Sequence, residues 1–188
     1  TINDVVLTIV SGALRKYLVS KDELPEDSLV AAVPIDVRTK DDAHINGNRI
    51  NITNVSLRTD IVDPIERLKA VHREAVAGKA YANTLGKNIL IDVLDNLHGG
   101  VVAWGIHAAV DSGILDKFPP ANNTIVTNVP GAPVPLYLCG AKLIDSFGMG
   151  PLIPNTGLFH TISSTYDFVT IAFTADRQKM EDPDFYVQ

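Results

Sequence analysis

The sequence predicts an α/β domain in which helices cover a layered, mixed β-sheet. Apolar residues recur at helical spacing near the N-terminus and again from residue 65, whereas residues 29–37 and 169–174 are short runs rich in β-branched side chains. Helices and strands mix without regular alternation or an internal repeat, which favours a mixed sheet. With 188 residues, 46% of them hydrophobic and 20% charged, the chain is long and apolar enough for one domain with a buried core.

The first 20 residues predict an amphipathic helix. Thr1 or Asn3 can cap its N-terminus, and Asp4 suits the positive end of the helix dipole. One wide apolar face follows, made of Val5, Val6, Ile9, Val10, Ala13, Leu14, Tyr17 and Leu18. A buried strand is expected next, at residues 29–37, where Pro34 places it near an edge or a bulge.

A second helix is predicted to begin at Asp63. Asp63 suits the N-cap, Pro64 the first helical position, and Glu66 can complete a capping box. We expect the charged residues that follow to form a solvated face: Arg67, Lys69, Arg73 and Glu74.

The other elements are shorter. Residues 49–58 alternate, but their apolar residues change face midway (Ile50 and Ile52, then Val55 and Leu57), so we expect a shift of register. Two short helices are expected at residues 88–97 and 100–110. Two paired strands are expected at residues 161–164 and 169–174, joined through Tyr166 and Asp167.

We expect the chain to be organised around residues 124–143. A buried strand at residues 124–126 ends at Asn128, because three prolines follow within seven residues and proline cannot donate to a β ladder. An apolar strand pattern resumes at residues 136–138. A rigid crossing between two buried strands suits a functional site. The alternative is a proline-rich connection that only lowers the entropy of the unfolded chain.

Composition and charge exclude several classes of function. A net charge of −6 and the lack of a basic tail make nucleic acid an unexpected partner. Cys139 is the only cysteine, which excludes an internal disulfide and fits a reducing compartment such as the cytoplasm. We expect Cys139 to be a small buried hydrophobe. The best candidate for a membrane span, residues 99–110, has only 12 residues and is too short.

Several motifs resemble the C-terminal half of the bacterial wax ester synthase/diacylglycerol acyltransferase family. The central ones are Asn128-Val129-Pro130-Gly131, Leu136-Tyr137 and Gly140-Ala141-Lys142-Leu143. Further similar segments are Asn3-Asp4-Val5-Val6-Leu7, residues 33–38, 47–50 and 57–68, and Ala175-Asp176-Arg177 with Asp182-Pro183 behind it. Their order along nearly the whole chain is more specific than any single motif. The departures from the pattern, which bear on substrate preference more than on fold, are Ala132, Phe159-His160 and Tyr166-Asp167.

The resemblance implies one of two similar halves of a chloramphenicol-acetyltransferase-like fold, which condensation domains also share. Residues 1–188 would then be a single domain of a longer acyltransferase, without its N-terminal catalytic half and C-terminal tail. The start at Thr1, without an initiator Met, and the end just after Asp182-Pro183, which can open another helix, also suggest a piece of a longer protein.

Roles for individual residues come from the resemblance alone. It implies that Asn3 and Asp4 support the site from the interface between the halves. Asn128, Pro130 and Gly131 would shape the substrate tunnel, and Gly140 would line the acyl pocket, where a missing side chain leaves room for a long chain. The alternatives are structural: Asn3 as a helix cap only, Asn128 as a turn residue only and Gly140 as a strand bend only.

We expect no catalytic residue on this chain. The family's His-His-x-x-x-Asp-Gly motif, whose second His is the general base, would lie on the missing half. His107 and Asp111 match it only partly, because Ile106 replaces the first His and a residue precedes Gly113; their spacing equally fits an ordinary helical pair. The remaining histidines show no metal-ligand spacing and are expected to be structural or exposed: His44, His72, His98 and His160.

The leading hypothesis is the C-terminal half of a cytoplasmic acyl-CoA-dependent O-acyltransferase, with or without peripheral association with a membrane or lipid droplet. It would make wax esters or triacylglycerol from fatty acyl-CoA and a long-chain alcohol or diacylglycerol. Its partners would be the N-terminal half and these substrates, with acyl-CoA a substrate and no cofactor. One alternative is a non-catalytic binding domain of the same fold. Another is a condensation-type acyltransferase that acts on amines or thioesters.

Overall fold

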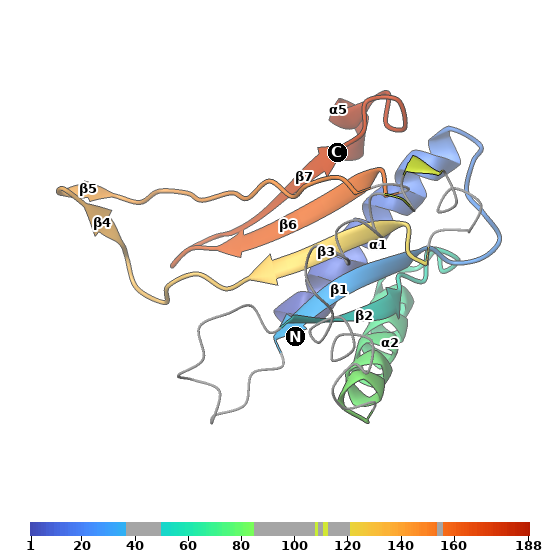
Figure 1. Cartoon of the computed structure of the whole chain (residues 1–188), viewed down its shortest axis with the longest axis horizontal. Coiled ribbons are helices and arrows are strands. Elements are labelled where there is room, and N and C mark those ends of the chain that lie inside the picture. Colours follow the sequence, from blue (N-terminus) through green and yellow to red (C-terminus); the bar gives the residue numbers. More distant parts are fainter. Residues whose placement is uncertain (37–49, 85–107, 109–110, 113–120, 154–155) are drawn as a thin grey trace.

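In the computed structural model, which describes residues 1–36, 50–84, 108, 111–112, 121–153 and 156–188, a five-stranded sheet carries two long helices on one face (Figure 1). Its strand order is β2-β1-β3-β6-β7. The strands are β1 (Val30–Asp36), β2 (Ile50–Ser56), β3 (Thr124–Val129), β6 (Leu158–Ser164) and β7 (Val169–Ala175). The three central strands run parallel, while β2 and β7 join the edges antiparallel. The predicted α/β class with a mixed sheet is confirmed.

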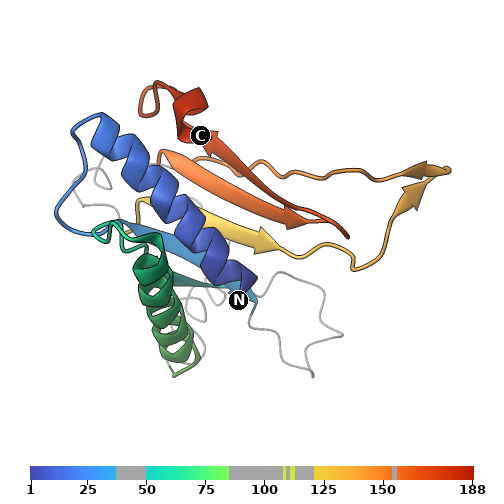
Figure 2. The ribbon, with the colours of Figure 1, turned by 180° about the vertical axis from the view of Figure 1, so that it is seen from behind.

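The first helix, α1 (Ile2–Ser20), packs along the sheet (Figure 2). Thr1 is its N-cap: the Thr1 hydroxyl accepts from the Asp4 backbone N–H, and the Asp4 carboxylate accepts from the Thr1 amino group at 2.7 Å. This capping box decides between the two expected caps in favour of Thr1. The apolar face of α1 buries Leu7 and Val10 in the core.

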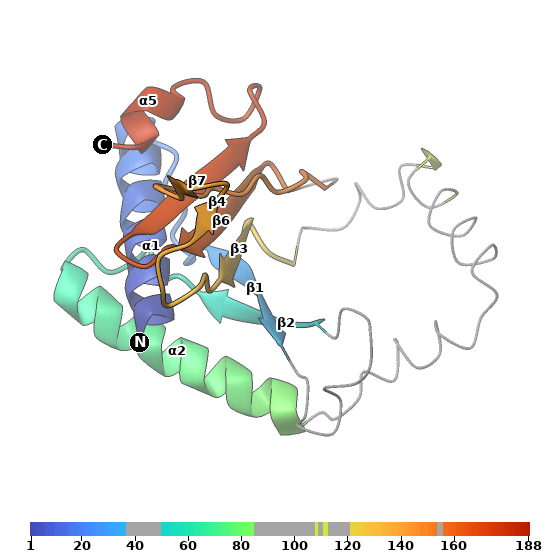
Figure 3. The same cartoon turned by 90° about the vertical axis from the view of Figure 1, so that its left-hand side faces the viewer.

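The second helix, α2 (Pro64–Thr84), lies beside α1 on the same side of the sheet (Figure 3). Its predicted start is confirmed, because Asp63 Oδ1 accepts from the backbone N–H of Ile65 at 2.9 Å and of Glu66 at 2.8 Å.

The expected solvated face of α2 is wrong for Arg67, which is buried between the two helices. Gly12 of α1 makes room for its guanidinium, whose Nη1 donates to the Ile61 carbonyl oxygen at 3.0 Å. Burial, with the neighbouring charge of Arg15, lowers the pKa of Arg67.

The expected shift of register in β2 is also wrong. Its ladder with β1 is continuous from the Val30/Ser56 pair to the Asp36/Ile50 pair. Val55 points to the buried, helix-covered side, whereas Ile52 lies on the other side and is exposed. The sequence prediction took Ile52 for a buried residue, although it lies on the exposed face of a strand whose pairing is regular.

Pro34 lies inside β1, a central strand of the sheet. The parallel ladder between β1 and β3 includes only Ala31 and Ala32, so Pro34 lies beyond it and pairs with Ile52 of β2 alone. The strand is locally an edge at Pro34, where a missing backbone donor costs nothing in the ladder with β3.

The last strands and the C-terminus close the fold. β6 and β7 form the predicted hairpin, in which the Thr165 N–H donates to the Phe168 carbonyl oxygen at 2.8 Å. The short helix α5 (Pro183–Tyr186), capped by Asp182, brings Tyr186 onto the core beside Tyr17 of α1. The helices predicted at residues 88–97 and 100–110 lie outside the described residues, apart from residue 108, which is helical.

Candidate functional site

Between β3 and β6 the chain leaves the sheet and returns, and we call this excursion, residues 130–153, the arm (Figure 1). Its distal part is a two-stranded hairpin of β4 (Tyr137–Leu138) and β5 (Ala141–Lys142). Cys139 and Gly140 form the two-residue turn, with φ of 49° and 84°. Positive φ at both positions is typical of a type I′ turn, which glycine favours and which suits a tight hairpin.

The arm differs from the sequence prediction in its burial. The expected apolar strand at residues 136–138 is exposed, and Cys139 lies exposed at the tip of the hairpin rather than in the core. Apolar pattern alone could not separate a buried strand from a projecting one, because both need the same residues once a partner covers them.

The base of the arm is held to the sheet by side-chain hydroxyls. On the segment that leaves β3, the Gly131 N–H donates to Ser164 Oγ at 2.8 Å. A Cβ at Gly131 would overlap the Ser164 carbonyl oxygen, so only glycine allows this approach.

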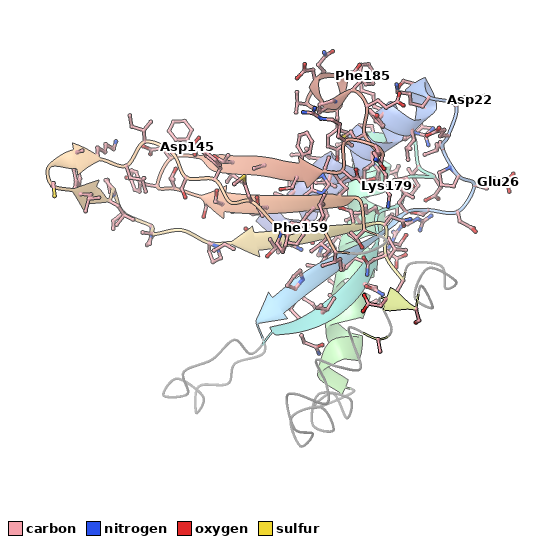
Figure 4. The ribbon with its side chains drawn as sticks, turned by 45° about the horizontal axis from the view of Figure 1, so that its top comes forward. Asp22, Glu26, Asp145, Phe159, Lys179 and Phe185 are labelled. Atoms are coloured by element: carbon pink, nitrogen blue, oxygen red, sulfur yellow. The ribbon has the colours of Figure 1, made fainter. Side chains whose placement is uncertain are left out.

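The returning segment of the arm, residues 143–153, is held in the same way, on the face of the sheet opposite the helices (Figures 1 and 2). Thr161 Oγ1 donates to the Gly148 carbonyl oxygen at 2.6 Å, and Ser163 Oγ to that of Ser146. Thr170 Oγ1 of β7 donates to the carboxylate of Asp145 at 2.6 Å, beside the β6–β7 hairpin (Figure 4). These hydroxyls fix the direction in which the arm leaves the sheet. Their alternation along β6 was the sequence signal for this contact, and sequence reasoning missed it.

A cavity of about 210 Å³ lies between the base of the arm and the turn of the β6–β7 hairpin. Its lining is largely apolar, with Lys142 and Asp167 as the charged members. The lining residues are Gly131, Ala132, Val134, Pro135, Leu136, Lys142, Leu143, Ile144, Ser146, Ser164, Thr165, Tyr166, Asp167 and Phe168. The volume is below the range of about 300–1,000 Å³ typical of small-molecule sites, so the cavity fits part of a ligand rather than a whole cofactor.

Large apolar side chains are exposed along the arm. Leu138 near the tip is 80% exposed, and Met149 on the returning segment is 84% exposed. Others on the arm are Val134, Leu136, Tyr137, Leu143, Ile144, Phe147, Leu152 and Ile153. Large exposed apolar side chains gathered on one segment are typical of an interaction site.

Asn3 and Asp4 lie at the start of α1, away from the cavity. Asp4 is buried, and its Oδ2 contacts the Nδ1 of His72 on α2 at 2.9 Å. Burial alone raises the pKa of Asp4, but hydrogen bonds from the Thr1 amino group, His72 and the Thr1 hydroxyl outweigh it, so the pKa is lowered. Asn3 is half-buried beside this pair.

The predicted site residues therefore fall into three places. Asn128 lies in β3, one residue before its end, Pro130 and Gly131 follow the strand, and of these three only Gly131 lines the cavity. Gly140 lies at the tip of the arm, where a Cβ would meet no atom within 4 Å. Neither Asn3 nor Asp4 lines the cavity. The described residues do not bring these sites into one pocket, and the roles implied for them stay predictions.

His160 is a buried histidine whose pKa is shifted from the ordinary value. It is buried under α5: its Nε2 contacts the Tyr186 hydroxyl at 2.8 Å and its Nδ1 contacts Thr124 Oγ1 at 3.0 Å. Because the Thr124 hydroxyl donates to the Leu158 carbonyl oxygen, it accepts from His160, which places the proton on Nδ1. Burial lowers the pKa of His160 to about 4. The ring is thus a neutral structural contact, one of the two roles expected for it.

Among the residues that the structure describes, no three His, Cys, Asp or Glu side chains converge as a metal site, and no helix is long and apolar enough to cross a membrane. His44, His98 and His107 lie outside the described residues, and Asp111 is exposed in a helical segment. The cavity lining contains no histidine, so it can bind and orient a ligand but offers no imidazole base.

Comparison with known proteins identifies the family to which the chain belongs. The profile of the WS/DGAT C-terminal domain matches residues 46–188. A Mycobacterium tuberculosis protein named as a diacylglycerol O-acyltransferase is 32% identical over 184 residues, which cover 96% of this chain and 39% of that protein. The O-acyltransferase WSD of Acinetobacter baylyi is 33% identical over 180 residues, covering 96% of this chain and 38% of that protein.

A solved structure of a wax ester synthase/diacylglycerol acyltransferase has a similar fold. The wax ester synthase/diacylglycerol acyltransferase from Marinobacter aquaeolei VT8 superposes on the whole chain with a TM-score of 0.65 and 26% identity, over 41% of its own length. The chain thus spans about two fifths of the length of the relatives that it matches. The chain belongs to the WS/DGAT C-terminal domain family.

Proposed function

We propose that this chain is the C-terminal half of an acyl-CoA-dependent O-acyltransferase that makes wax esters or triacylglycerol. The observation that carries the proposal is the family match over residues 46–188, together with relatives named as acyltransferases. The remainder of such a protein, its N-terminal half, is the proposed partner and the proposed source of the general base.

In the proposed reaction, the base on the N-terminal half takes the proton of a long-chain alcohol or of diacylglycerol. The oxygen attacks the thioester carbonyl of fatty acyl-CoA, forming the ester bond. The carbon–sulfur bond breaks, and the CoA thiolate leaves and takes up the proton. No cofactor is required, because acyl-CoA is itself the acyl donor.

The contribution of this chain is a wall of the substrate tunnel between the halves. The arm supports this role, because it is fixed at its base and carries apolar side chains into solvent along its length. We place Asn128, Pro130 and Gly131 at the tunnel wall and Gly140 at the acyl pocket, where the other half meets the tip. Asn3 and Asp4 support the interface from the start of α1.

We also propose a cytoplasmic protein that docks peripherally on a membrane or lipid droplet, since its acceptor substrates are apolar. Co-sedimentation with vesicles of phosphatidylcholine that contain diacylglycerol tests this docking. Recovery of all the protein in the supernatant contradicts it.

The function is tested by acyl transfer from palmitoyl-CoA to hexadecanol or to diacylglycerol. The chain alone, the upstream half alone and the two together are compared. Activity only in the combination is expected. Activity of this chain alone would place a catalytic group on it and return His107 and Asp111 to consideration. No ester from any sample, with the halves folded and associated, favours a binding domain, and transfer to an amine instead favours the condensation type.

The arm is tested in the longer protein by Leu138→Asp, matched with Val62→Asp. Both side chains are largely exposed in this chain, at 80% and 72%, but Val62 lies before α2 and not on the arm. We expect Leu138→Asp to lower acyl transfer at least tenfold and Val62→Asp to leave it within about twofold. Equal effects of the two substitutions refute the role of the arm.

A further inference from the structure

A row of apolar side chains lies on the outer side of α1 and begins at its first residue. Ile2, Val5 and Ile9 follow one another at spacings of three and four residues, which places them on one side of the helix. They are 62%, 47% and 52% exposed, whereas Leu7 and Val10 are buried in the core. We call Ile2, Val5 and Ile9 the α1 stripe.

We propose that the α1 stripe is a contact surface for the polypeptide that precedes Thr1 in the longer protein. This inference rests on the proposed function in one respect: the chain is taken as the C-terminal part of its protein. The matched family is a C-terminal domain, and the chain spans 39% of a relative's length. In such a protein most of the remaining polypeptide precedes the matched domain, and the stripe lies at the start of the first helix of this chain.

The stripe is rigidly presented. The Ser11 hydroxyl donates to the Leu57 carbonyl oxygen at 2.6 Å, and Arg15 Nη1 donates to the Thr59 carbonyl oxygen at 2.6 Å. Asp4 contacts His72 at 2.9 Å. These three bonds join α1 to the loop after β2 and to α2 along most of the helix. A partner therefore meets a preorganised surface, and binding costs little ordering entropy.

The chemistry of the stripe suits a polypeptide rather than a lipid surface. Between residues 2 and 14 the only charged residue is Asp4, which is buried, and the next, Arg15, is bonded inward to Thr59. Helices that bind membranes carry Lys and Arg around their apolar face, and the net charge of −6 adds no attraction to anionic lipid. An uncharged apolar stripe is complementary to apolar side chains.

Its position also suits the upstream half. The N-terminus of α1 lies toward the end of the sheet from which the arm leaves (Figures 1 and 2). One partner that reaches the arm from this end therefore passes the start of α1. The stripe and the arm then form two separate parts of one interface.

The test is cysteine labelling in the longer protein, with Cys139→Ser in the background. Ile9→Cys and Val19→Cys are compared, because the two native side chains lie on the same helix and are 52% and 54% exposed. The rate of maleimide modification is read for each site by peptide mass spectrometry and normalised to the unfolded protein. We expect Ile9→Cys to react at least tenfold more slowly than Val19→Cys. Val5→Cys repeats the test within the stripe.

Equal rates at the two sites overturn the proposal. So does protection of Ile9→Cys that arises only after vesicles of phosphatidylcholine and phosphatidylglycerol are added, which would make the stripe a lipid contact. Acyl transfer is measured on the same preparations. An active protein with an unprotected stripe contradicts this inference alone, whereas an inactive protein with a protected stripe contradicts the proposed acyltransferase function alone.

Discussion

Acid should destabilise this domain through one buried side chain, His160. Its folded-state pKa is about 4, compared with an ordinary value of 6.5, because burial disfavours the imidazolium. As the pH falls below 6.5, the unfolded chain binds a proton at this histidine while the folded chain does not. The stability that the neutral ring provides is therefore complete above pH 6.5, declines between pH 6.5 and 4, and is lost below pH 4.

The magnitude follows from the difference between the two pKa values. About 2.5 pH units, at about 1.4 kcal/mol for each, correspond to a loss of about 3 kcal/mol in the free energy of unfolding between pH 7 and pH 4. That is a large part of the 5–15 kcal/mol typical of natural domains.

The assay is urea denaturation at a series of pH values, for the native sequence and for His160→Phe, which has a similar volume and no titrating group. At pH 7 the variant should be less stable by about 1–3 kcal/mol, since the buried Tyr186 hydroxyl loses its acceptor. Adding Tyr186→Phe removes that hydroxyl too and should recover much of the loss.

Toward pH 4 the native protein should lose about 3 kcal/mol more than the variant. Carboxylates titrate equally in both proteins, so the difference isolates His160. Parallel loss, or an imidazole NMR titration of His160 near 6.5, refutes the reasoning.

Three further predictions concern the arm and the start of α1. Gly131→Ala should lower the free energy of unfolding by at least about 2 kcal/mol, because the new Cβ would overlap the Ser164 carbonyl group. At Gly140 a Cβ would meet no atom within 4 Å, so Gly140→Ala should cost only about 1–2 kcal/mol, for the positive φ. Thermal unfolding compares the two variants, and equal losses of stability contradict the clash at Gly131. Asp4→Ala should lower the free energy of unfolding by about 1 kcal/mol at pH 7. Because the folded-state pKa of Asp4 is lowered, the difference in stability between the variant and the native protein should shrink as the pH falls below about 4. A difference in urea midpoints that stays constant with pH contradicts a stabilising role of the ionised Asp4 carboxylate. His72→Asn, whose amide can donate where Nδ1 does, should retain more stability than His72→Leu; equal melting temperatures show that the bond to Asp4 contributes nothing.

The sequence by itself determined the features that depend on neighbours in the chain. The starts of the described helices α1, α2 and α5 could be predicted, at Thr1, Asp63 and Asp182. In each case a capping side chain accepts a hydrogen bond from a backbone N–H three residues away. The β6–β7 hairpin was readable for the same reason, since its turn and alternation are local. Family membership was readable too, because it depends on the order of motifs and not on their contacts.

The tertiary structure alone decided which faces are covered. Arg67 follows the pattern of a solvated residue, yet it is buried, because Gly12 on another helix leaves space for it. Ile52 has the pattern of a core residue, yet it is exposed, because the helices cover the other face of β2. The sequence did not show that Cys139 lies at an exposed hairpin tip or that His160 lies under Tyr186.

The physical reason is the range of the interactions. Caps and turns form between atoms a few residues apart, so the residues that specify them stand together in the sequence. Burial and pKa depend on which elements meet across the fold, over separations such as the 36 residues from Thr124 to His160. The exposed arm and the α1 stripe follow the same rule, because their amino acids alone do not show which partner would cover them.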